Sequence, residues 1–66
     1  MFHEYDVVYA KRDLAVCVPK GTHGTIVMVY DPERGDYEVE FFDRQGNHIA
    51  LLTVRAVDIE SGSQEA

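Results

Sequence analysis

The sequence predicts an all-β fold in which five short strands bend into a small barrel. Two observations carry this prediction. Glycines at positions 21 and 24 open an apolar segment that runs to Tyr30, and a second segment, 37–41, alternates strictly between apolar and acidic residues. Short segments of this kind, separated by turn residues, are typical of small sandwiches and barrels. Such an architecture has no built-in chemistry, so function has to be argued from the side chains.

The first strand is expected from residue 5 or 6 to residue 9 or 10, where Val7, Val8 and Tyr9 have strong β preference. A polar loop over residues 11–20 follows. Its apolar centre is short, and Pro19 restricts the residue before it and cannot donate a ladder hydrogen bond. A helix over 11–18 is the alternative, but it lacks a cap pair and would be stopped early by glycine.

The second strand is expected from residue 22 or 24 to Tyr30, and both of its faces are apolar. In a small barrel this pattern indicates a bend at which the inward parity changes, helped by a glycine or a bulge. We therefore expect Ile26, Val27 and Val29 in the core and Met28 outside.

The third strand has the clearest alternation in the chain. Tyr37, Val39 and Phe41 are expected to face inward, and Glu38 and Glu40 outward. The two carboxylates should project side by side from one face of the strand, because alternate residues share a face.

Turns are expected over 31–36, where Gly35 can take a positive φ, and over 43–47, where Gly46 or Asn47 can do so. A fourth strand should cover residue 48 to residue 53 or 54. One helical turn over 55–58 and a short fifth strand at 59–60, closing back on the first, complete the plan. Five short strands with one 3₁₀ turn before the last strand are the plan of an SH3-like barrel. We expect residues 1–60 to form this single domain and residues 61–66 to be a disordered tail.

The single cysteine, Cys17, excludes a disulfide scaffold within the chain. Between two valines it is expected to be a small buried hydrophobe. As a nucleophile it would need a base, and His23 is near in sequence, but nothing is in place to hold that base. No catalytic residue is therefore expected, and the chain is not expected to be an enzyme.

The net charge of −6 and the pI of about 4.7 argue against a general nucleic-acid binder, whose affinity comes mainly from Lys and Arg. They also argue against binding to anionic membranes. No uncharged stretch approaches the roughly 20 residues of a membrane helix, and the N-terminus does not resemble a signal peptide. A cytoplasmic protein is expected, and a single unpaired cysteine fits a reducing compartment.

No metal or cofactor site is expected either. His3, His23, His48 and Cys17 lack the short paired spacing of structural zinc ligands. Gly21 and Gly24 fit neither a phosphate loop nor a dinucleotide fingerprint, so their role is expected to be in the backbone.

The acidic stretch from Asp31 to Asp43 holds half of the acids in the chain. It is interpreted either as a solvated outer face that keeps the protein in solution or as a docking surface for a basic partner. The candidate partner-binding residues are Glu38, Glu40, Phe42 and Met28. Phe42 shares the outward parity of the two glutamates, and it is either an interface anchor or an inward-turned end of the barrel. An exposed Phe42 would also fit a homodimer.

Several segments in fixed order resemble a family of short bacterial proteins known as the domain of unknown function 4926 family. They are Asp6-Val7-Val8, Lys20-Gly21, Gly24-Thr25-Ile26-Val27, Val29-Tyr30, Tyr37-Glu38-Val39-Glu40-Phe41, Gly46 and Ile49-Ala50-Leu51-Leu52-Thr53. The resemblance spans residue 5 to about residue 59. It implies a stand-alone SH3-like barrel with no assigned enzymatic activity or cofactor, and a dedicated partner encoded nearby.

More distantly, residues 20–26 are similar to the glycine-bearing hairpin of KOW modules in ribosomal and transcription proteins. Those modules are usually basic where they touch RNA or a polymerase, and this acidic chain departs from that pattern. The sequence thus favours a non-catalytic module that binds a protein partner or a second copy of itself through an outer acidic and aromatic face, in order to regulate or neutralise a neighbouring gene product. The alternative is a KOW-like nucleic-acid, ribosome-associated or transcription-associated module.

Overall fold

The computed structural model describes residues 2–31 and 33–62, and within them the fold is all-β with one short helix, as predicted. The elements are β1 (Val7–Ala10), β2 (His23–Asp31), β3 (Asp36–Phe42), β4 (His48–Arg55), the 3₁₀ helix η1 (Ala56–Asp58) and β5 (Ile59–Ser61). No helix in the described chain has the length and apolar character needed to cross a bilayer.

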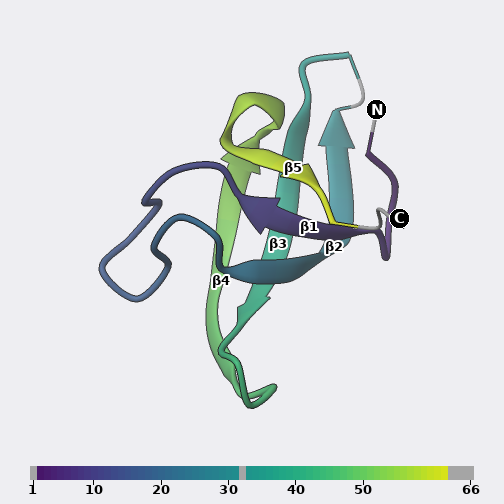
Figure 1. Cartoon of the computed structure of the whole chain (residues 1–66). Coiled ribbons are helices and arrows are strands. Elements are labelled where there is room, and N and C mark those ends of the chain that lie inside the picture. The colour runs from purple at the N-terminus through teal and green to yellow at the C-terminus, as the bar shows by residue number, and fades with distance from the viewer. Residues whose placement is uncertain (1, 32, 63–66) are drawn as a thin grey trace.

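The five strands form one antiparallel sheet in the order β4-β3-β2-β1-β5. The sheet bends strongly, so that β1 and β5 cross in front of β3 and β4 (Figure 1). It is not a closed barrel, because no ladder in the described residues joins β4 to β5. All three residues of β5 pair with β1, so the last strand extends the far side of the sheet instead of closing it onto β4.

A bulge in β2 explains why both faces of this strand are apolar. The register with β3 shifts between Ile26 and Met28 and again between Val29 and Asp31. Ile26 is fully buried, Val29 packs against the core and Met28 is 46% exposed, as predicted. Val27 differs from the prediction, because it is half-buried and lies outside the core cluster. The register passes over Val27, which places it where the inward parity changes.

The core is centred on the inward face of β3, where Tyr37, Val39 and Phe41 are buried as the alternation predicts. Gly24 of β2 lies opposite Phe41. A Cβ atom on Gly24 would lie 2.8 Å from the carbonyl oxygen of Glu40 and 2.9 Å from the Phe41 ring. Glycine is therefore required here for the close approach of two strands and not for a positive φ.

The 11–22 loop contains no helix, and its apolar centre forms an isolated bridge between Ala15 and Val18. Val18 is fully buried and joins the core. Cys17 is exposed, so the expectation of a buried cysteine is wrong. The turn over 16–17 directs Val18 inward, and its neighbour in sequence is consequently turned outward.

Asp58 closes the C-terminal end of the fold. Its carboxylate accepts hydrogen bonds from the Arg12 guanidinium at 2.6 Å and from the backbone N–H of Arg55 at 2.9 Å. Burial acts to raise the pKa of Asp58, but these hydrogen bonds and the arginine charges outweigh it and hold the pKa below its usual value. The contact ties the loop after β1 to η1, and the backbone N–H of Lys11 also donates to the Asp58 carbonyl.

The expected disordered tail lies mostly outside the described residues, which end at Gly62. Ser61 belongs to β5, and the backbone N–H of Gly62 donates to the Val7 carbonyl. The domain boundary that was expected after residue 60 therefore lies beyond Ser61, because regular pairing with β1 continues to this residue.

Candidate functional site

The outward side chains of β2, β3 and β4 form a mixed acidic and apolar surface, which we call the outer acidic face: Met28, Tyr30, Glu38, Glu40, Leu51 and Thr53. Cross-strand pairing sets its geometry. Met28 pairs with Glu38 and Glu38 with Thr53, while Glu40 pairs with Leu51. Paired residues share one face of a sheet, so the two carboxylates that were predicted to project side by side do so.

Glu38 is held in place by its neighbours on both sides. Its Oε1 atom accepts a hydrogen bond from the Thr53 hydroxyl at 2.6 Å and another from the Tyr30 hydroxyl at 3.1 Å. The hydrogen bond to Glu38 raises the pKa of Tyr30, because the protonated phenol is the form that can donate. The Glu38 carboxylate is thus fixed in position, and no residue of the described chain donates a hydrogen bond to its second oxygen.

Large apolar side chains surround these carboxylates. Tyr30 and Met28 on β2 are 54% and 46% exposed, and Leu51 on β4 is 53% exposed, so these side chains lie on both sides of the glutamates of β3. Exposed apolar side chains that occur singly are normal on a protein surface. Three of them beside two glutamates on adjacent strands form the kind of mixed surface on which protein interfaces are built.

A row of aromatic and imidazole rings crosses the sheet at the start of β2 and the end of β3, and we call it the aromatic row: Tyr9, His23, Phe42 and His48. Each member pairs with the next across β1, β2, β3 and β4. His23 stacks on Phe42 with ring centroids 5.9 Å apart, and His48 meets the edge of Phe42 at 6.3 Å. Phe42 is half-buried within this row.

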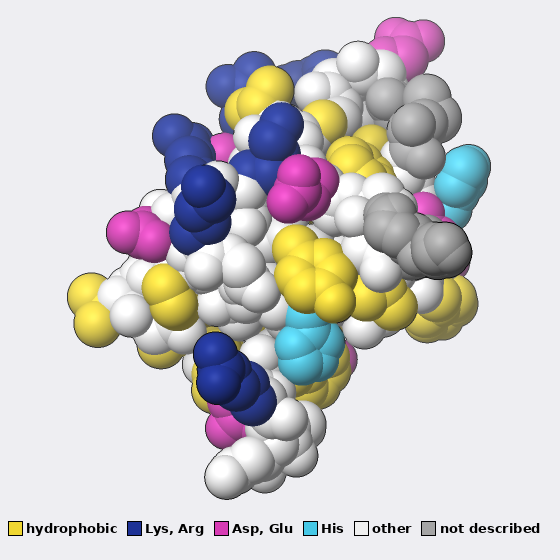
Figure 2. Space-filling model, viewed as in Figure 1, with side chains coloured by type: hydrophobic (Ala, Val, Ile, Leu, Met, Phe, Trp, Pro, Cys, Tyr) yellow, Lys and Arg dark blue, Asp and Glu magenta, His cyan; other side chains and the backbone are white. Residues whose placement is uncertain are grey.

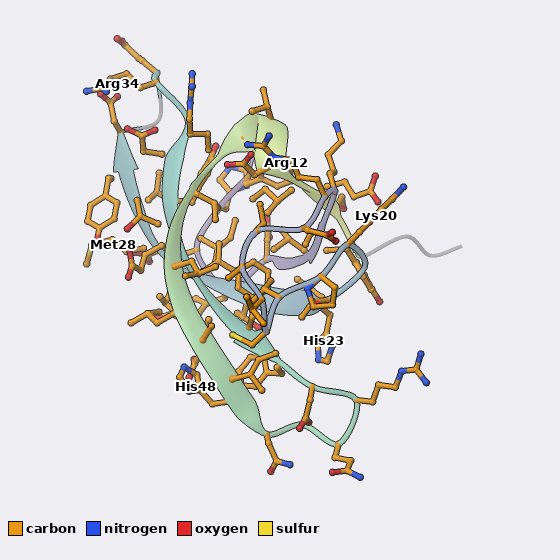
Figure 3. All side chains as sticks on the ribbon, turned by 90° about the vertical axis from the view of Figure 1, so that its left-hand side faces the viewer. Arg12, Lys20, His23, Met28, Arg34 and His48 are labelled. Carbon is orange, nitrogen blue, oxygen red and sulfur yellow. The ribbon has the colours of Figure 1, made fainter. Side chains whose placement is uncertain are left out.

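The four predicted site residues therefore fall into two groups. Met28, Glu38 and Glu40 form one group on the outer acidic face, where Met28 and Glu38 are direct cross-strand partners. Phe42 lies four residues along β3 from Glu38, about 13 Å away at the rise of an extended strand. His48 connects the two groups, because its Nε2 atom lies 3.7 Å from Glu40 while its ring contacts Phe42. Figure 3 shows Met28 well separated from His23 and Lys20.

The aromatic row borders a shallow groove of about 300 Å³ between the 11–22 loop and the turn after β3. Its lining includes Cys17, Lys20, His23, Phe42 and Arg44. Figure 2 shows most of the visible Lys and Arg side chains gathered at the upper left and a separate one lower down, to the left of the central histidine. The groove was not predictable from the sequence, because Lys20 and Arg44 are far apart along the chain and no motif links the two loops that carry them.

The remaining candidate ligands are spread over the molecule. His3 lies 3.7 Å from Asp6 at the N-terminal turn, while His23 and His48 stand on opposite sides of Phe42. Within residues 2–31 and 33–62, no group of three His, Cys, Asp or Glu side chains is arranged to hold a metal ion. The features that could bind a ligand or partner are thus the two glutamates, the aromatic row and the groove.

These features define a small all-β domain whose one five-stranded antiparallel sheet carries an acidic, partly apolar outer face. The chain belongs to the family described as domain of unknown function (DUF4926), whose profile matches residues 4–61. Comparison with curated proteins and with solved structures gives no significant match.

Proposed function

We propose that this protein is a non-catalytic interaction module that binds a basic protein partner through its outer acidic face. The observation that carries the proposal is the placement of Glu38 and Glu40 among exposed Met28, Tyr30 and Leu51. Apolar side chains supply buried area at an interface, and the carboxylates select a cationic partner and speed its approach.

The organisation of the chain supports this role. The inward residues of all five strands are occupied in building the core, so the working surface is the outside of the sheet. The strand order and the 3₁₀ turn before β5 agree with an SH3-like plan in an open form. A dedicated partner encoded nearby, which this module would regulate or neutralise, is the form of the proposal that fits so small and acidic a chain.

Co-expression with the product of the adjacent gene, followed by size-exclusion chromatography at low and high salt, tests the proposal. We expect a complex at low salt that weakens as salt is raised, because surface charges are screened. Charge reversal of Glu38→Lys with Glu40→Lys should abolish the complex. A control with Glu4→Lys and Glu60→Lys changes the net charge equally at exposed sites away from this face and should retain it.

Two results would contradict the proposal. One is a monomeric elution profile with no complex at low salt. The other is an equal loss of binding in the two charge-reversed proteins, because the effect would then come from net charge and not from the outer acidic face.

The groove supports a second candidate, the KOW-like nucleic-acid module. Lys20 and Arg44 line the groove beside the stacked pair of His23 and Phe42, and cations beside stacking rings suit single-stranded nucleic acid. The net charge of −6 opposes this function. Titration with RNA and single-stranded DNA at about 50 mM salt tests it, because screening is weak there. Binding that is lost in Lys20→Glu would favour this candidate, and no binding would remove it.

A further inference from the structure

The backbone of β4 has a short open segment at the edge of the sheet. The N–H of Ala56 donates to the carbonyl of Gly35 at 2.8 Å, and this hydrogen bond fixes the alternation along β4. In an antiparallel ladder, every second residue exchanges hydrogen bonds with the neighbouring strand. Alternate residues counted back from Ala56 direct their backbone N–H and C=O groups toward β3. The residues between them, including Leu51 and Thr53, therefore direct these groups away from β3.

Both ends of this edge are already occupied. The N–H of Arg55, which has the same parity as Thr53, donates to the Asp58 carboxylate at 2.9 Å. At the other end, the thiol of Cys17 lies 3.8 Å from the carbonyl oxygen of Ile49. Between them, β4 is the last strand of the sheet, and no backbone hydrogen bond from residues 2–31 or 33–62 reaches the outer side of Leu51 or Thr53. We call residues 51–53 the open edge.

We infer that the open edge accepts an extended, lysine-bearing or arginine-bearing segment of the partner as an additional strand. This inference rests on the proposed function and specifies how the partner is held. Two N–H groups and two carbonyl groups at Leu51 and Thr53 supply the backbone contacts, since each residue carries one of each. An exposed sheet edge is a template for such strand addition, in which the main chain supplies affinity and alternate side chains supply specificity.

Side-chain parity assigns the chemistry of the added segment. Leu51 and Thr53 face outward together with Glu40 and Glu38, their partners on β3. Residues of the incoming segment opposite Leu51 and Thr53 therefore project onto the outer acidic face. The segment would lie two strand spacings from β3, about 10 Å. A lysine or arginine can place its aliphatic stem over exposed Leu51 and bring its charge to Glu38 or Glu40.

A second copy of this chain fits the open edge less well. Its own β4 presents His48 and Arg55 near its two ends and no cation in between, so it would bring no positive charge beside the glutamates. Two copies would also bring together net charges of −6 each. Charge complementarity thus selects a basic segment from another protein.

The direct test uses a synthetic peptide in which lysine alternates with valine and threonine, measured by fluorescence anisotropy and by amide hydrogen exchange. We expect the peptide to bind at low salt and to slow the exchange of the Leu51 and Thr53 amides specifically. The same peptide with N-methylated backbone amides should fail to bind, because it cannot complete the ladder. A peptide with glutamate in place of lysine should also fail. These arms use the unmodified protein, so they do not depend on a variant folding.

Two variants of one residue separate backbone from side-chain effects. Leu51→Pro removes an outward N–H, and proline is tolerated on an edge strand where that group faces solvent. It should weaken binding by roughly tenfold or more, a loss of about 1.4 kcal/mol or greater. Leu51→Ala keeps the N–H and should weaken binding much less.

Several outcomes would overturn the inference. The first two are no binding of the lysine peptide at low salt and equal binding of the N-methylated peptide. The third is exchange protection at the Lys20 and Arg44 groove in place of the open edge. The fourth is concentration-dependent protection of the Leu51 amide in the free protein, which would identify a second copy as the occupant. If the adjacent gene product binds and depends on Glu38 and Glu40 but is unaffected by Leu51→Pro, the proposed function stands and the strand addition does not.

Discussion

The Thr53 hydroxyl and the Glu38 carboxylate lie 2.6 Å apart and join β4 to β3 on the outer face of the sheet. The same Glu38 oxygen accepts a hydrogen bond from the Tyr30 hydroxyl of β2, so one carboxylate links three adjacent strands. A hydrogen bond to a charged acceptor is stronger than one between neutral groups. The charge that we expect a partner to recognise is therefore also the best-anchored side chain of that face.

Replacing Glu38 should lower the pKa of Tyr30. The hydrogen bond to Glu38 raises this pKa in the native protein, and Glu38→Ala removes both the acceptor and the negative charge. NMR titration of the Tyr30 ring signals measures the change. Glu40→Ala is the control, because no hydrogen bond in the described chain joins Glu40 to Tyr30. An unchanged Tyr30 titration in Glu38→Ala would contradict the contact.

Asp58→Asn should destabilise the fold by about 1–3 kcal/mol, because a charged acceptor for Arg12 and the Arg55 N–H is replaced by a neutral one. Chemical denaturation near neutral pH measures this loss. Leu51→Asn, at an exposed position, is a control that should change stability little. Equal stability of Asp58→Asn and the parent protein would show that Asp58 does not fasten the loop to η1.

The same residue sets part of the acid sensitivity. The pKa of Asp58 is lowered in the folded state, so its contribution is present above the ordinary aspartate pKa of about 3.9 and is lost as pH falls through the lower folded value. Unfolding free energies measured below about pH 4 should therefore fall more steeply in the parent protein than in Asp58→Asn. Asp43, whose pKa is lowered by hydrogen bonds from the Asn47 backbone and neighbouring groups, titrates in both proteins and cancels in the comparison. Parallel curves would contradict the assignment.

Gly24→Ala should destabilise the protein by about 1–3 kcal/mol through overpacking. The new Cβ would meet the Glu40 carbonyl oxygen at 2.8 Å, and backbone cannot move aside as a flexible side chain can. Thr25→Ala, at the neighbouring half-buried position, adds no atoms and serves as the control. Thermal denaturation of both variants would decide the matter, and a Gly24→Ala protein as stable as its control would show that β2 and β3 can separate without cost.

Cys17 should react with a thiol reagent in the folded protein at a rate close to that of the unfolded chain, because its side chain is exposed. Mass spectrometry of briefly treated native protein measures the labelling. Val18→Cys in a Cys17→Ala background places the thiol at a fully buried position, and it should react much more slowly. Protection of Cys17 in the native state would contradict its placement in the loop.

The sequence predicted the strands well wherever side-chain periodicity was decisive. Alternation in β3 placed Tyr37 and Phe41 inside correctly, and the two apolar faces of β2 predicted its irregularity. The identity of the residue at the bulge could not be predicted, because the choice between Val27 and its neighbours depends on the register with β3. The pairing of the last strand with the first was predicted correctly, because β5 does pair with β1. Closure of the barrel could not be judged from local pattern, since it requires a further pairing between the two edge strands, β4 and β5.

The candidate site was predicted only in part for the same reason. Parity along one strand placed Glu38 and Glu40 on a common face, but it could not show that Tyr30 and Thr53 would both bond to Glu38. The bulge between Phe41 and Phe42 arises in the pairing with β4, and the ring partners of Phe42 come from two other strands, β2 and β4. Cys17 was misplaced because flanking valines suggest burial, whereas one loop turn is enough to direct consecutive residues in opposite directions.

The position of β1 between β2 and β5 has a consequence for biosynthesis. The strand made first is flanked on one side by the strand made last, so its second neighbour does not exist until residues 59–61 have left the ribosome. Contacts between distant parts of a chain form late and slowly. A nascent chain of this protein can assemble the β2–β3–β4 meander during translation. The pairing of β1 with β5 can form only after residues 59–61 have been synthesised.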